Sequence, residues 1–280
     1  MTGDYEYRGL VAEAWDLLRG DTANWPDRAF YRALIGQARG PALDVGCGTG
    51  RLMLDYLAGG VDVDGVDNSP EMLALCRAKA TSMGIDVADR LFEQEMDRLA
   101  LARQYATIIV PSSSFQLLTD PAAADTALAR FFKHLIPGGL LVMSIMSKLW
   151  PGKRTPPQME WSGWHKIAER QRPDGATIRR WMRTQYDHIQ QLEHEENRYE
   201  VLRDGVVVQT EMHARAPAAR WYSQAQVRTL YEDAGFAEVK LTSGFTFEPA
   251  SVEDTTFCVI GTRGGVVCGR PDCSVARRLP

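Results

Sequence analysis

Residues 43–50 read Leu43-Asp44-Val45-Gly46-Cys47-Gly48-Thr49-Gly50, and this stretch decides the fold. The apolar run over 42–45 predicts a short buried strand, and a helix is expected to follow the glycine turn over about 51–57. Glycine lets the backbone turn sharply and approach a ligand closely, and the start of a helix favours an anionic group. The sequence therefore predicts a ligand-binding turn between a strand and a helix.

The spacing of the glycines sets this turn apart from a dinucleotide-binding one. Gly48 and Gly50 lie two and four residues after Gly46, whereas the third glycine of the dinucleotide fingerprint lies three residues beyond the second. This spacing disfavours a nicotinamide enzyme. A second acid, Asp67, follows the next expected strand, 61–66. A carboxylate there can accept hydrogen bonds from both hydroxyls of a ribose.

Outward from this turn, strands and helices alternate. Strands are expected over 42–45, 61–66, 90–96, 106–111 and 140–147. Helices are expected over 51–57, from a cap at Ser69 onward, and over 122–135, and residues 5–37 are also expected to be helical with a break at Pro26. Such alternation predicts an α/β fold in which helices cover both faces of a parallel sheet.

The alternation stops near residue 150. Residues 151–176 are expected to form loops or a short helix, and 177–222 to form antiparallel strands with a hairpin turn at Asp204-Gly205. A helix to about 234 and strands ending near 241 and 262 complete the pattern. The predicted organisation is an N-terminal helical segment (1–38), a ligand-binding core domain in two pieces (39–150 and 223–263), an inserted β subdomain (151–222) and a flexible tail (264–280).

Five sequence elements, in this order, resemble the class I S-adenosylmethionine-dependent methyltransferases. They are the glycine turn and the stretches GVDNSPEM (65–72), EQEM (93–96), PSSSFQ (111–116) and LIPGG (135–139). Ala234-Gly235-Phe236 before a terminal strand extends the match. The resemblance implies a Rossmann-like, mostly parallel sheet with an antiparallel last strand, and it makes the inserted β subdomain a substrate lid. It also implies S-adenosyl-L-methionine as cofactor and S-adenosyl-L-homocysteine as product.

The resemblance assigns cofactor contacts residue by residue. Eleven residues are implied: Asp44, Gly46, Gly48, Gly50, Arg51, Asp67, Asn68, Met72, Glu95, Met96 and Ser112. The glycines would line the methionine moiety, Asp44 would receive its amino group, and Asp67 would bind the ribose. Residues 68, 72, 95 and 96 would surround the adenine, and Ser112 would lie near the transferable methyl. Either methionine could instead be an ordinary core residue, and Cys47 is expected to be a buried filler.

The sequence is less informative about a general base. Methyl transfer is an in-line displacement in which positioning alone can lower the barrier by roughly 7–11 kcal/mol. A neutral amine needs no base, whereas an alcohol usually does. Gln116 follows the fourth expected strand, where similar natural-product N-methyltransferases can place a histidine, and an amide cannot act as a base.

Three residues are candidates for the catalytic position: Gln116 itself, Tyr7, and His165, which follows Trp161 and Trp164 in the expected lid. Further candidates for a base are Tyr5, His188, His194, His213 and Tyr222. Each could equally be an ordinary packed or surface residue. No cluster has the spacing of metal ligands, so no metal site is predicted.

Charge in the insertion is uneven. Residues 165–183 hold six Lys and Arg against Glu169 and Asp174, whereas 187–204 hold mostly acids. The favoured interpretation is that paired strands neutralise one another. A second interpretation is an anion-binding lid that selects a phosphate or a carboxylate, and RNA binding comes third.

Overall composition excludes several classes of function. The 280 residues carry a net charge of -4, which provides no general attraction for nucleic acid or an anionic membrane. No apolar run reaches the ~20 residues that span a bilayer, the first residues do not resemble a signal peptide, and five scattered cysteines do not form a disulfide framework. We therefore expect a cytoplasmic protein with a small-molecule partner; a homodimer stays open.

The leading hypothesis is a methyltransferase that transfers a methyl group to a nitrogen or oxygen atom of a small molecule, natural products included. Two alternatives remain. One is a protein with the same fold that binds the cofactor without methyl transfer, as a cyclase or an interaction module. The other is an RNA or protein methyltransferase.

Overall fold

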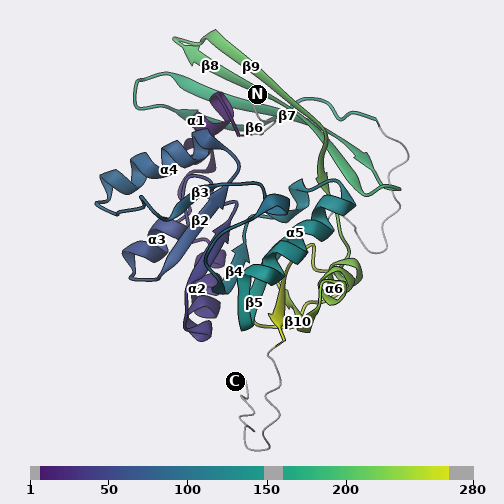
Figure 1. The fold of residues 1–280 in the computed structure, drawn as a ribbon. Coiled ribbons are helices and arrows are strands. Elements are labelled where there is room, and N and C mark those ends of the chain that lie inside the picture. The colour runs from purple at the N-terminus through teal and green to yellow at the C-terminus, as the bar shows by residue number, and fades with distance from the viewer. Residues whose placement is uncertain (1–6, 148–159, 265–280) are drawn as a thin grey trace, which may run out of the picture.

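The computed structural model describes residues 7–147 and 160–264, which form two β-sheets and the helices around them (Figure 1). The large sheet has the strand order β10-β11-β5-β4-β1-β2-β3. Its strands are β1 (Ala42–Val45), β2 (Val63–Asp67), β3 (Leu91–Glu93), β4 (Tyr105–Val110), β5 (Leu135–Met146), β10 (Phe236–Ser243) and β11 (Thr256–Arg263). Only β11 runs antiparallel to its neighbours. The predicted mostly parallel sheet with an antiparallel last strand is confirmed.

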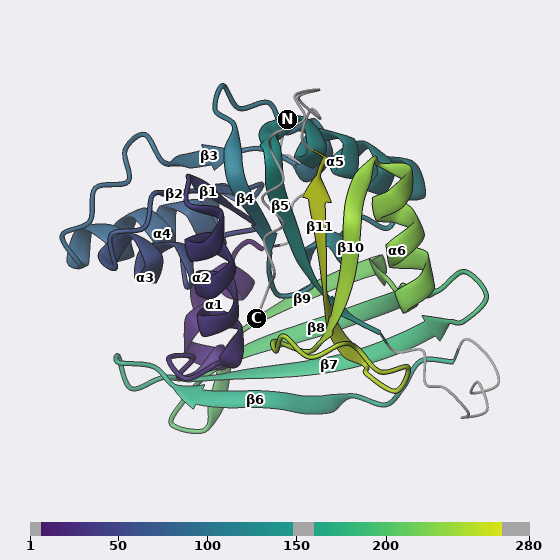
Figure 2. The ribbon, with the colours of Figure 1, turned by 90° about the horizontal axis from the view of Figure 1, so that it is seen from below.

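Helices cover both faces of this sheet (Figure 2). One face packs against α2 (Pro26–Ala38), α3 (Met53–Ala58) and α4 (Pro70–Ser82), and the other against α5 (Pro121–His134) and α6 (Gln224–Asp233). The strands alternate accordingly: Ile108 and Val110 of β4 belong to the core under α5 and α6, whereas Ile109 belongs to the core under α2–α4. Side chains alternate between the faces of a strand, so a strand such as β4, in which every residue is buried, fits a sheet covered on both sides.

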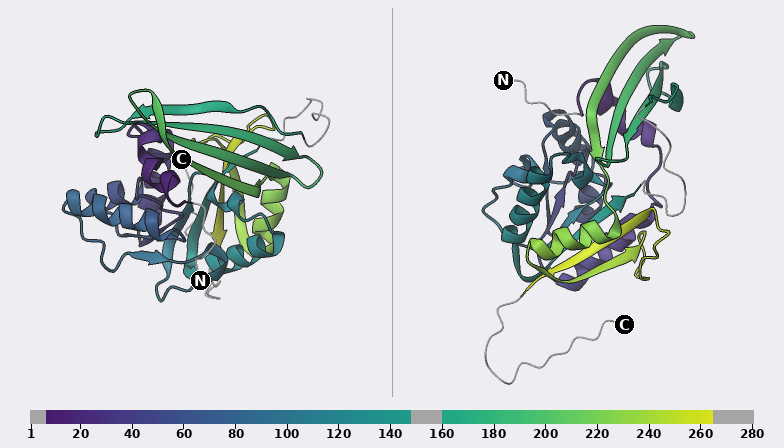
Figure 3. Two further views of the ribbon diagram at one scale, coloured as in Figure 1. Left: turned by 90° about the horizontal axis from the view of Figure 1, so that it is seen from above. Right: turned by 90° about the vertical axis from the view of Figure 1, so that its right-hand side faces the viewer.

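The second sheet is antiparallel and lies across one end of the large one (Figure 3). Its strands are β6 (His165–Gln171), β7 (Thr177–Asp187), β8 (Leu192–Arg203) and β9 (Val206–Arg220). The hairpin turn at Asp204-Gly205 forms as predicted, with positive φ at both residues. The prediction of loops or a short helix over 151–176 is wrong for β6. This mostly polar edge strand pairs with β7 through its backbone, and such pairing requires no apolar alternation.

Two boundaries of the large sheet also differ from expectation. The fifth strand begins at Leu135 instead of residue 140, because Tyr105 pairs with Leu135 and Thr107 with Leu140. Residues 136–139, which lie between the expected helix and the expected strand, form an irregularity within this strand. β3 is shorter than the predicted 90–96, because the chain leaves the sheet after Glu93 and enters the short 3-10 helix η1 (Met96–Arg98).

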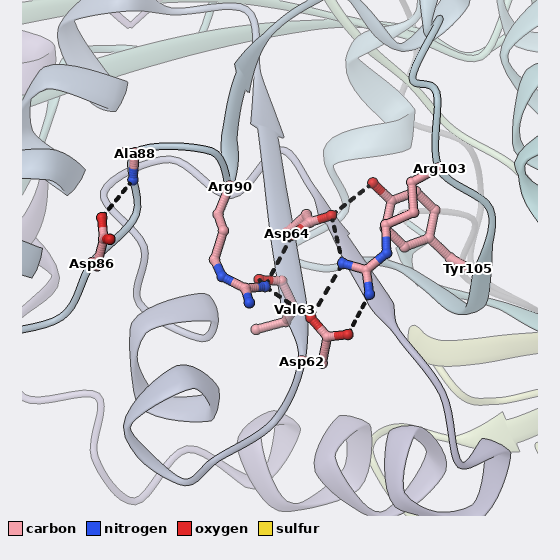
Figure 4. A network of polar contacts seen from close by, with 8 residues as sticks. All are labelled: Asp62, Val63, Asp64, Asp86, Ala88, Arg90, Arg103 and Tyr105. Carbon is pink, nitrogen blue, oxygen red and sulfur yellow. Dashed lines mark hydrogen bonds and ion pairs between the residues drawn. The ribbon is translucent and has the colours of Figure 1, made fainter.

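An ion-pair network joins three strands at their amino ends (Figure 4). The buried Asp64 accepts hydrogen bonds from the Tyr105 hydroxyl (3.0 Å), Arg90 (3.2 Å) and Arg103 (3.1 Å). Both arginines also bind Asp62 and hold the pKa of its carboxyl below its usual value. The network fixes the starts of β2, β3 and β4, which leaves their carboxyl ends available for a ligand.

Candidate active site

A cavity of about 580 Å³ lies at the carboxyl ends of β1, β2 and β4. Its walls come from the glycine turn, η1 and the residues after β4, and also from the N-terminal helix α1 (Leu10–Arg19) and the second sheet. Ligand pockets for small molecules usually measure about 300–1,000 Å³. The cavity is therefore large enough for a nucleoside-sized ligand and part of a second molecule.

The glycine turn forms the floor of the cavity. Gly46 donates a backbone hydrogen bond to the Val66 carbonyl (2.8 Å), and its φ of +73° favours glycine. A Cβ on Gly46 would lie 2.9 Å from the Ser114 hydroxyl oxygen, and one on Gly48 would lie 3.3 Å from the Met72 methyl carbon. The turn is thus held close to two neighbouring walls.

Gly50 has a different role from the other two glycines. It does not line the cavity, and a Cβ there would lie 2.6 Å from the Cys76 sulfur and 2.8 Å from Cγ of Leu54. Its φ is +79°. Gly50 therefore allows the turn to pack against α3 and α4.

Asp67 links the turn to the end of β2. Its Oδ2 accepts a hydrogen bond from the Gly48 N–H (2.8 Å), and its Oδ1 accepts one from the Ser69 N–H (2.9 Å). Burial raises the pKa of this carboxyl, and these backbone hydrogen bonds oppose the rise. The acid is held in one orientation at the cavity wall.

Asp44 is the most unusual charge in the cavity. Its side chain is buried, and among the described residues its Oδ1 has no hydrogen-bond partner. Burial raises the pKa of Asp44 to about 7, an effect that the positive charge of Arg51 opposes. Arg51 is itself bound by both oxygens of Asp27. A buried acceptor without a partner is costly, so the site is suited to a ligand that donates to Asp44.

Strained backbone marks the exit of β4. Ser112 and Ser113 both have positive φ, 54° and 60°, which non-glycine residues rarely adopt. Residues of this kind concentrate at functional sites, because the surrounding structure must hold them there. Arg19 reaches from α1 to the Ser112 hydroxyl (3.5 Å).

α1 supplies a wall that sequence reasoning largely missed. Val11, Trp15, Leu18 and Arg19 of α1 line the cavity, together with Tyr7, which precedes the helix. The Arg19 guanidinium lies 4.9 Å from the Trp15 ring and 4.9 Å from the ring of Trp25. Burial and the nearby charge of Arg51 lower the pKa of Arg19. The sequence signal for this wall is that the amphipathic segment 10–19 ends in a basic residue, Arg19.

A family model described as a methyltransferase domain matches residues 42–139. The chain is therefore similar, over this segment, to the class I S-adenosylmethionine-dependent methyltransferases that its sequence elements resemble. It is 31% identical to the dTDP-3-amino-3,6-dideoxy-alpha-D-glucopyranose N,N-dimethyltransferase of Streptomyces fradiae, over 49% of this chain and 54% of that protein. It is 35% identical to the demethylmenaquinone methyltransferase of Thermus thermophilus, over 48% and 61%. The chain thus spans about half the length of the curated relatives it matches.

Solved methyltransferase structures share the fold over nearly the whole chain. An S-adenosylmethionine-dependent methyltransferase from Clostridium acetobutylicum superposes with a TM-score of 0.69 and 18% identity, covering 91% of this chain and 98% of that one. The sugar N-methyltransferase KedS8 from Streptoalloteichus gives 0.67 and 19%, covering 94% and 98%. At these identities the likeness establishes the fold.

Every residue that the family resemblance assigned to the cofactor lines the cavity except Gly50. Tyr7 also lines it, and the Tyr7 backbone carbonyl accepts a hydrogen bond from the Ser69 hydroxyl (2.6 Å). Within the described residues no histidine lines the cavity. His165 lies exposed at the start of β6, and Tyr5 falls outside the described residues.

Gln116 lies behind the cavity wall instead of in it. Its Nε2 donates to the carbonyls of Met146 (3.0 Å) and Arg220 (2.9 Å), and its Oε1 accepts from the Met146 N–H (2.8 Å). The amide therefore joins the end of β5 to the end of β9. Where the structure describes the chain, no three potential metal ligands cluster and no helix is long and apolar enough to cross a membrane.

Proposed function

We propose that this chain transfers a methyl group from S-adenosylmethionine to a small molecule, with an amine nitrogen as the preferred acceptor. The observation that carries the proposal is the unpartnered Oδ1 of Asp44, which lies in the same cavity as Asp67 and the glycine turn. The buried carboxyl of Asp44 suits an ammonium group, and the carboxyl of Asp67 suits the hydroxyls of a ribose, so the cavity suits a ligand that has both.

The lining residues fit the parts of this cofactor. Asp44 would accept a hydrogen bond from its ammonium group, and Arg19 and Arg51 would bind its carboxylate. Asp67 would bind the ribose, and Glu95 and Met96 would contact the adenine. When bound, the cofactor supplies an electrophilic methyl group on a sulfonium.

The residues that line the cavity also favour an amine nitrogen as the acceptor atom. An amine that arrives neutral needs no base, and the described part of the cavity wall holds no histidine. The relative from Streptomyces fradiae is named as an N,N-dimethyltransferase of an amino sugar, which supports an amine. The protein then positions the two reactants and excludes water. Under this proposal the second sheet acts as the substrate lid, and Tyr7 remains the candidate base for a hydroxyl acceptor.

Calorimetric titration of the protein with S-adenosylmethionine and S-adenosylhomocysteine tests the cofactor. Asp67→Ala should abolish measurable binding, whereas Asp89→Ala, an exposed acid before β3, should bind like the wild type. Unchanged affinity in Asp67→Ala would refute the assigned role of Asp67.

Transfer is tested by incubating the protein with the cofactor and a panel of amino sugars, other amines and matched alcohols. Mass spectrometry should show methylated amines together with S-adenosylhomocysteine. Cofactor binding without turnover on any acceptor would favour the cyclase-like alternative. Retention on heparin with a steep salt dependence would favour RNA methylation.

A further inference from the structure

Two arginines that line the cavity share one tryptophan. Arg19 of α1 and Arg51, directly after the glycine turn, both belong to the cavity wall. The Arg19 guanidinium lies 4.9 Å from the centre of the Trp25 ring, and the Arg51 guanidinium lies 5.1 Å from it. A guanidinium within about 6 Å of an indole is attracted by the ring. Trp25 therefore contacts both cations at once.

The start of α2 fixes the backbone of Trp25. Pro26 is the first residue of this helix, and Trp25 before it is extended, with φ of −67° and ψ of 133°. A proline keeps the preceding residue extended. The Trp25 N–H donates to the Thr22 carbonyl (3.2 Å), and the Trp25 carbonyl accepts from the Arg28 N–H (3.3 Å). Trp25 is 37% exposed and does not itself line the cavity.

Of the two arginines, Arg51 alone is neutralised by an acid. The buried Asp27 binds Arg51 through both carboxyl oxygens. Asp16, whose charge also acts on Arg19, binds Lys79 (2.7 Å). In the part of the chain that the structure describes, Arg19 forms no ion pair. The two arginines and Asp27 together therefore carry a positive charge, which an anionic group of a ligand would compensate.

Trp25 orders both guanidinium groups before a ligand arrives. An arginine that becomes ordered only on binding loses its rotamer freedom in that step, which weakens binding. Arg51 is also fixed by Asp27. Arg19 is also held by the Trp15 ring, at 4.9 Å. Trp25 is the contact that the two arginines have in common, so its removal would loosen both.

We propose that Trp25 is a positioning residue for the carboxylate end of the cofactor, and that it acts through Arg19 and Arg51. This role rests on the proposed function, which assigns the carboxylate of S-adenosylmethionine to these arginines. Trp25 would touch neither the cofactor nor the acceptor. The arginines would make tight binding depend on the carboxylate, and Trp25 would determine how large that dependence is.

Calorimetry on the full chain tests this role with two ligands, S-adenosylhomocysteine and its decarboxylated form, which keeps the adenosine and the ammonium group. The wild type should bind S-adenosylhomocysteine about tenfold more tightly or better, as expected for a charge-assisted hydrogen bond. Trp25→Ala should lower this affinity about tenfold, because two long side chains are then ordered only on binding. Its affinity for the decarboxylated ligand should stay within about twofold of the wild type, because that ligand has no group for the arginines. Trp25→Phe keeps an aromatic face and should retain most of the affinity for S-adenosylhomocysteine.

Trp181→Ala is the matched control. The Trp181 ring lies 5.2 Å from the Arg198 guanidinium and does not line the cavity, so this variant should bind both ligands like the wild type. A double variant tests whether Trp25 acts through Arg19. Adding Trp25→Ala to Arg19→Gln should lower the affinity for S-adenosylhomocysteine less than Trp25→Ala does alone, because one of the two positioned side chains is already gone.

Four results would overturn the role of Trp25: unchanged affinity of Trp25→Ala for S-adenosylhomocysteine, an equal loss for both ligands, a loss in Trp25→Phe as large as in Trp25→Ala, or additive losses in the double variant. If the wild type binds neither ligand, the proposed function fails as well. If the wild type binds both ligands equally well, the cofactor assignment stands and only the role of Trp25 and the arginines fails.

Discussion

At the scale of single residues, Asp44 combines a structural cost with a functional use. The residue is 2% exposed, and one carboxyl oxygen has no partner in the part of the chain that the structure describes, so the charged form is poorly solvated in the free protein. A cationic ligand would supply the missing interaction. The residue thus lowers the stability of the empty site in exchange for selectivity toward an ammonium group.

Asp44→Asn should separate these two effects. The pKa of Asp44 is raised to about 7, above the value of about 3.9 in an unfolded chain, so the folded state binds more protons between these values. The stability of the cofactor-free wild type should therefore fall as the pH rises from about 4 to 7. Asp44→Asn lacks this loss and should melt at a higher temperature than the wild type above pH 7, and at a similar temperature near pH 4.

The affinity of the wild type for the cofactor should rise with pH over the range in which its stability falls. Only the deprotonated carboxyl attracts an ammonium group, so wild-type affinity should weaken as the pH falls below about 7. At pH 8, Asp44→Asn should bind S-adenosylmethionine about tenfold more weakly or worse, as expected for a charged hydrogen bond, with a flatter pH profile. Calorimetry at three pH values measures this, and parallel profiles would contradict the assignment.

The local sequence was enough to predict that Asp44, Gly46 and Asp67 lie at the ligand-binding site, because a strand–turn–helix unit places nearby residues at one edge of a sheet. It could not distinguish Gly50 from Gly46, because the direction of each missing Cβ depends on the packing of α3 and α4. Nor could it place Arg19. That residue reaches Ser112 across 93 sequence positions, and no periodicity encodes such a contact.

At the scale of elements, Gln116 illustrates how a position can matter without reaching the substrate. Its side chain makes hydrogen bonds to β5 and β9, two strands of different sheets. The sequence correctly placed it after the fourth strand. Its partners lie 30 and 104 residues away, so the connection between sheets could not be predicted.

We predict that Gln116→Ala destabilises the protein and leaves cofactor affinity within about twofold. Gln116 is buried and its hydrogen bonds to Met146 and Arg220 would be lost, each of which contributes about 0.5–1.5 kcal/mol. Denaturant unfolding measures the loss. Gln104→Ala is the control, because this exposed amide makes one bond to Lys133. Wild-type stability combined with abolished methyl transfer would instead support a catalytic role for Gln116.

At the scale of the whole molecule, α1 belongs with the second sheet. Leu10, Val11 and Ala14 share a separate apolar cluster with Ile178 and Tyr199. Toward the core, α1 makes hydrogen bonds through Asp16, which accepts from Thr49 (2.7 Å) and from Lys79 (2.7 Å). The cavity therefore lies between one body built from α1 and the second sheet and another built from the core domain. The organisation predicted from the sequence places residues 1–38 and 151–222 in separate units, whereas residues of both share one apolar cluster.

Ile178→Ala should weaken the first of these bodies selectively. Truncating a buried isoleucine costs about 2–5 kcal/mol, and Ile178 is 1% exposed within the cluster. Amide hydrogen exchange should accelerate in α1, β7 and β8 together, and cofactor affinity should fall because α1 forms a wall of the cavity. Ile109→Ala, in the core beneath α2, serves as the comparison and should accelerate exchange in the large sheet. Faster exchange in β7 and β8 with α1 unchanged would contradict this coupling.

The tryptophans follow the same division. Trp15 lies in α1, Trp25 precedes α2, Trp161, Trp164 and Trp181 belong to the second sheet or the segment leading into it, and Trp221 follows β9. The seventh, Trp150, lies outside the described residues, and residues 39–147 and 223–263 contain none. The tryptophan fluorescence of this chain therefore originates outside residues 39–147 and 223–263. A change in tryptophan emission would report on α1, the second sheet and the segments that adjoin them, because the strands of the large sheet contain no tryptophan.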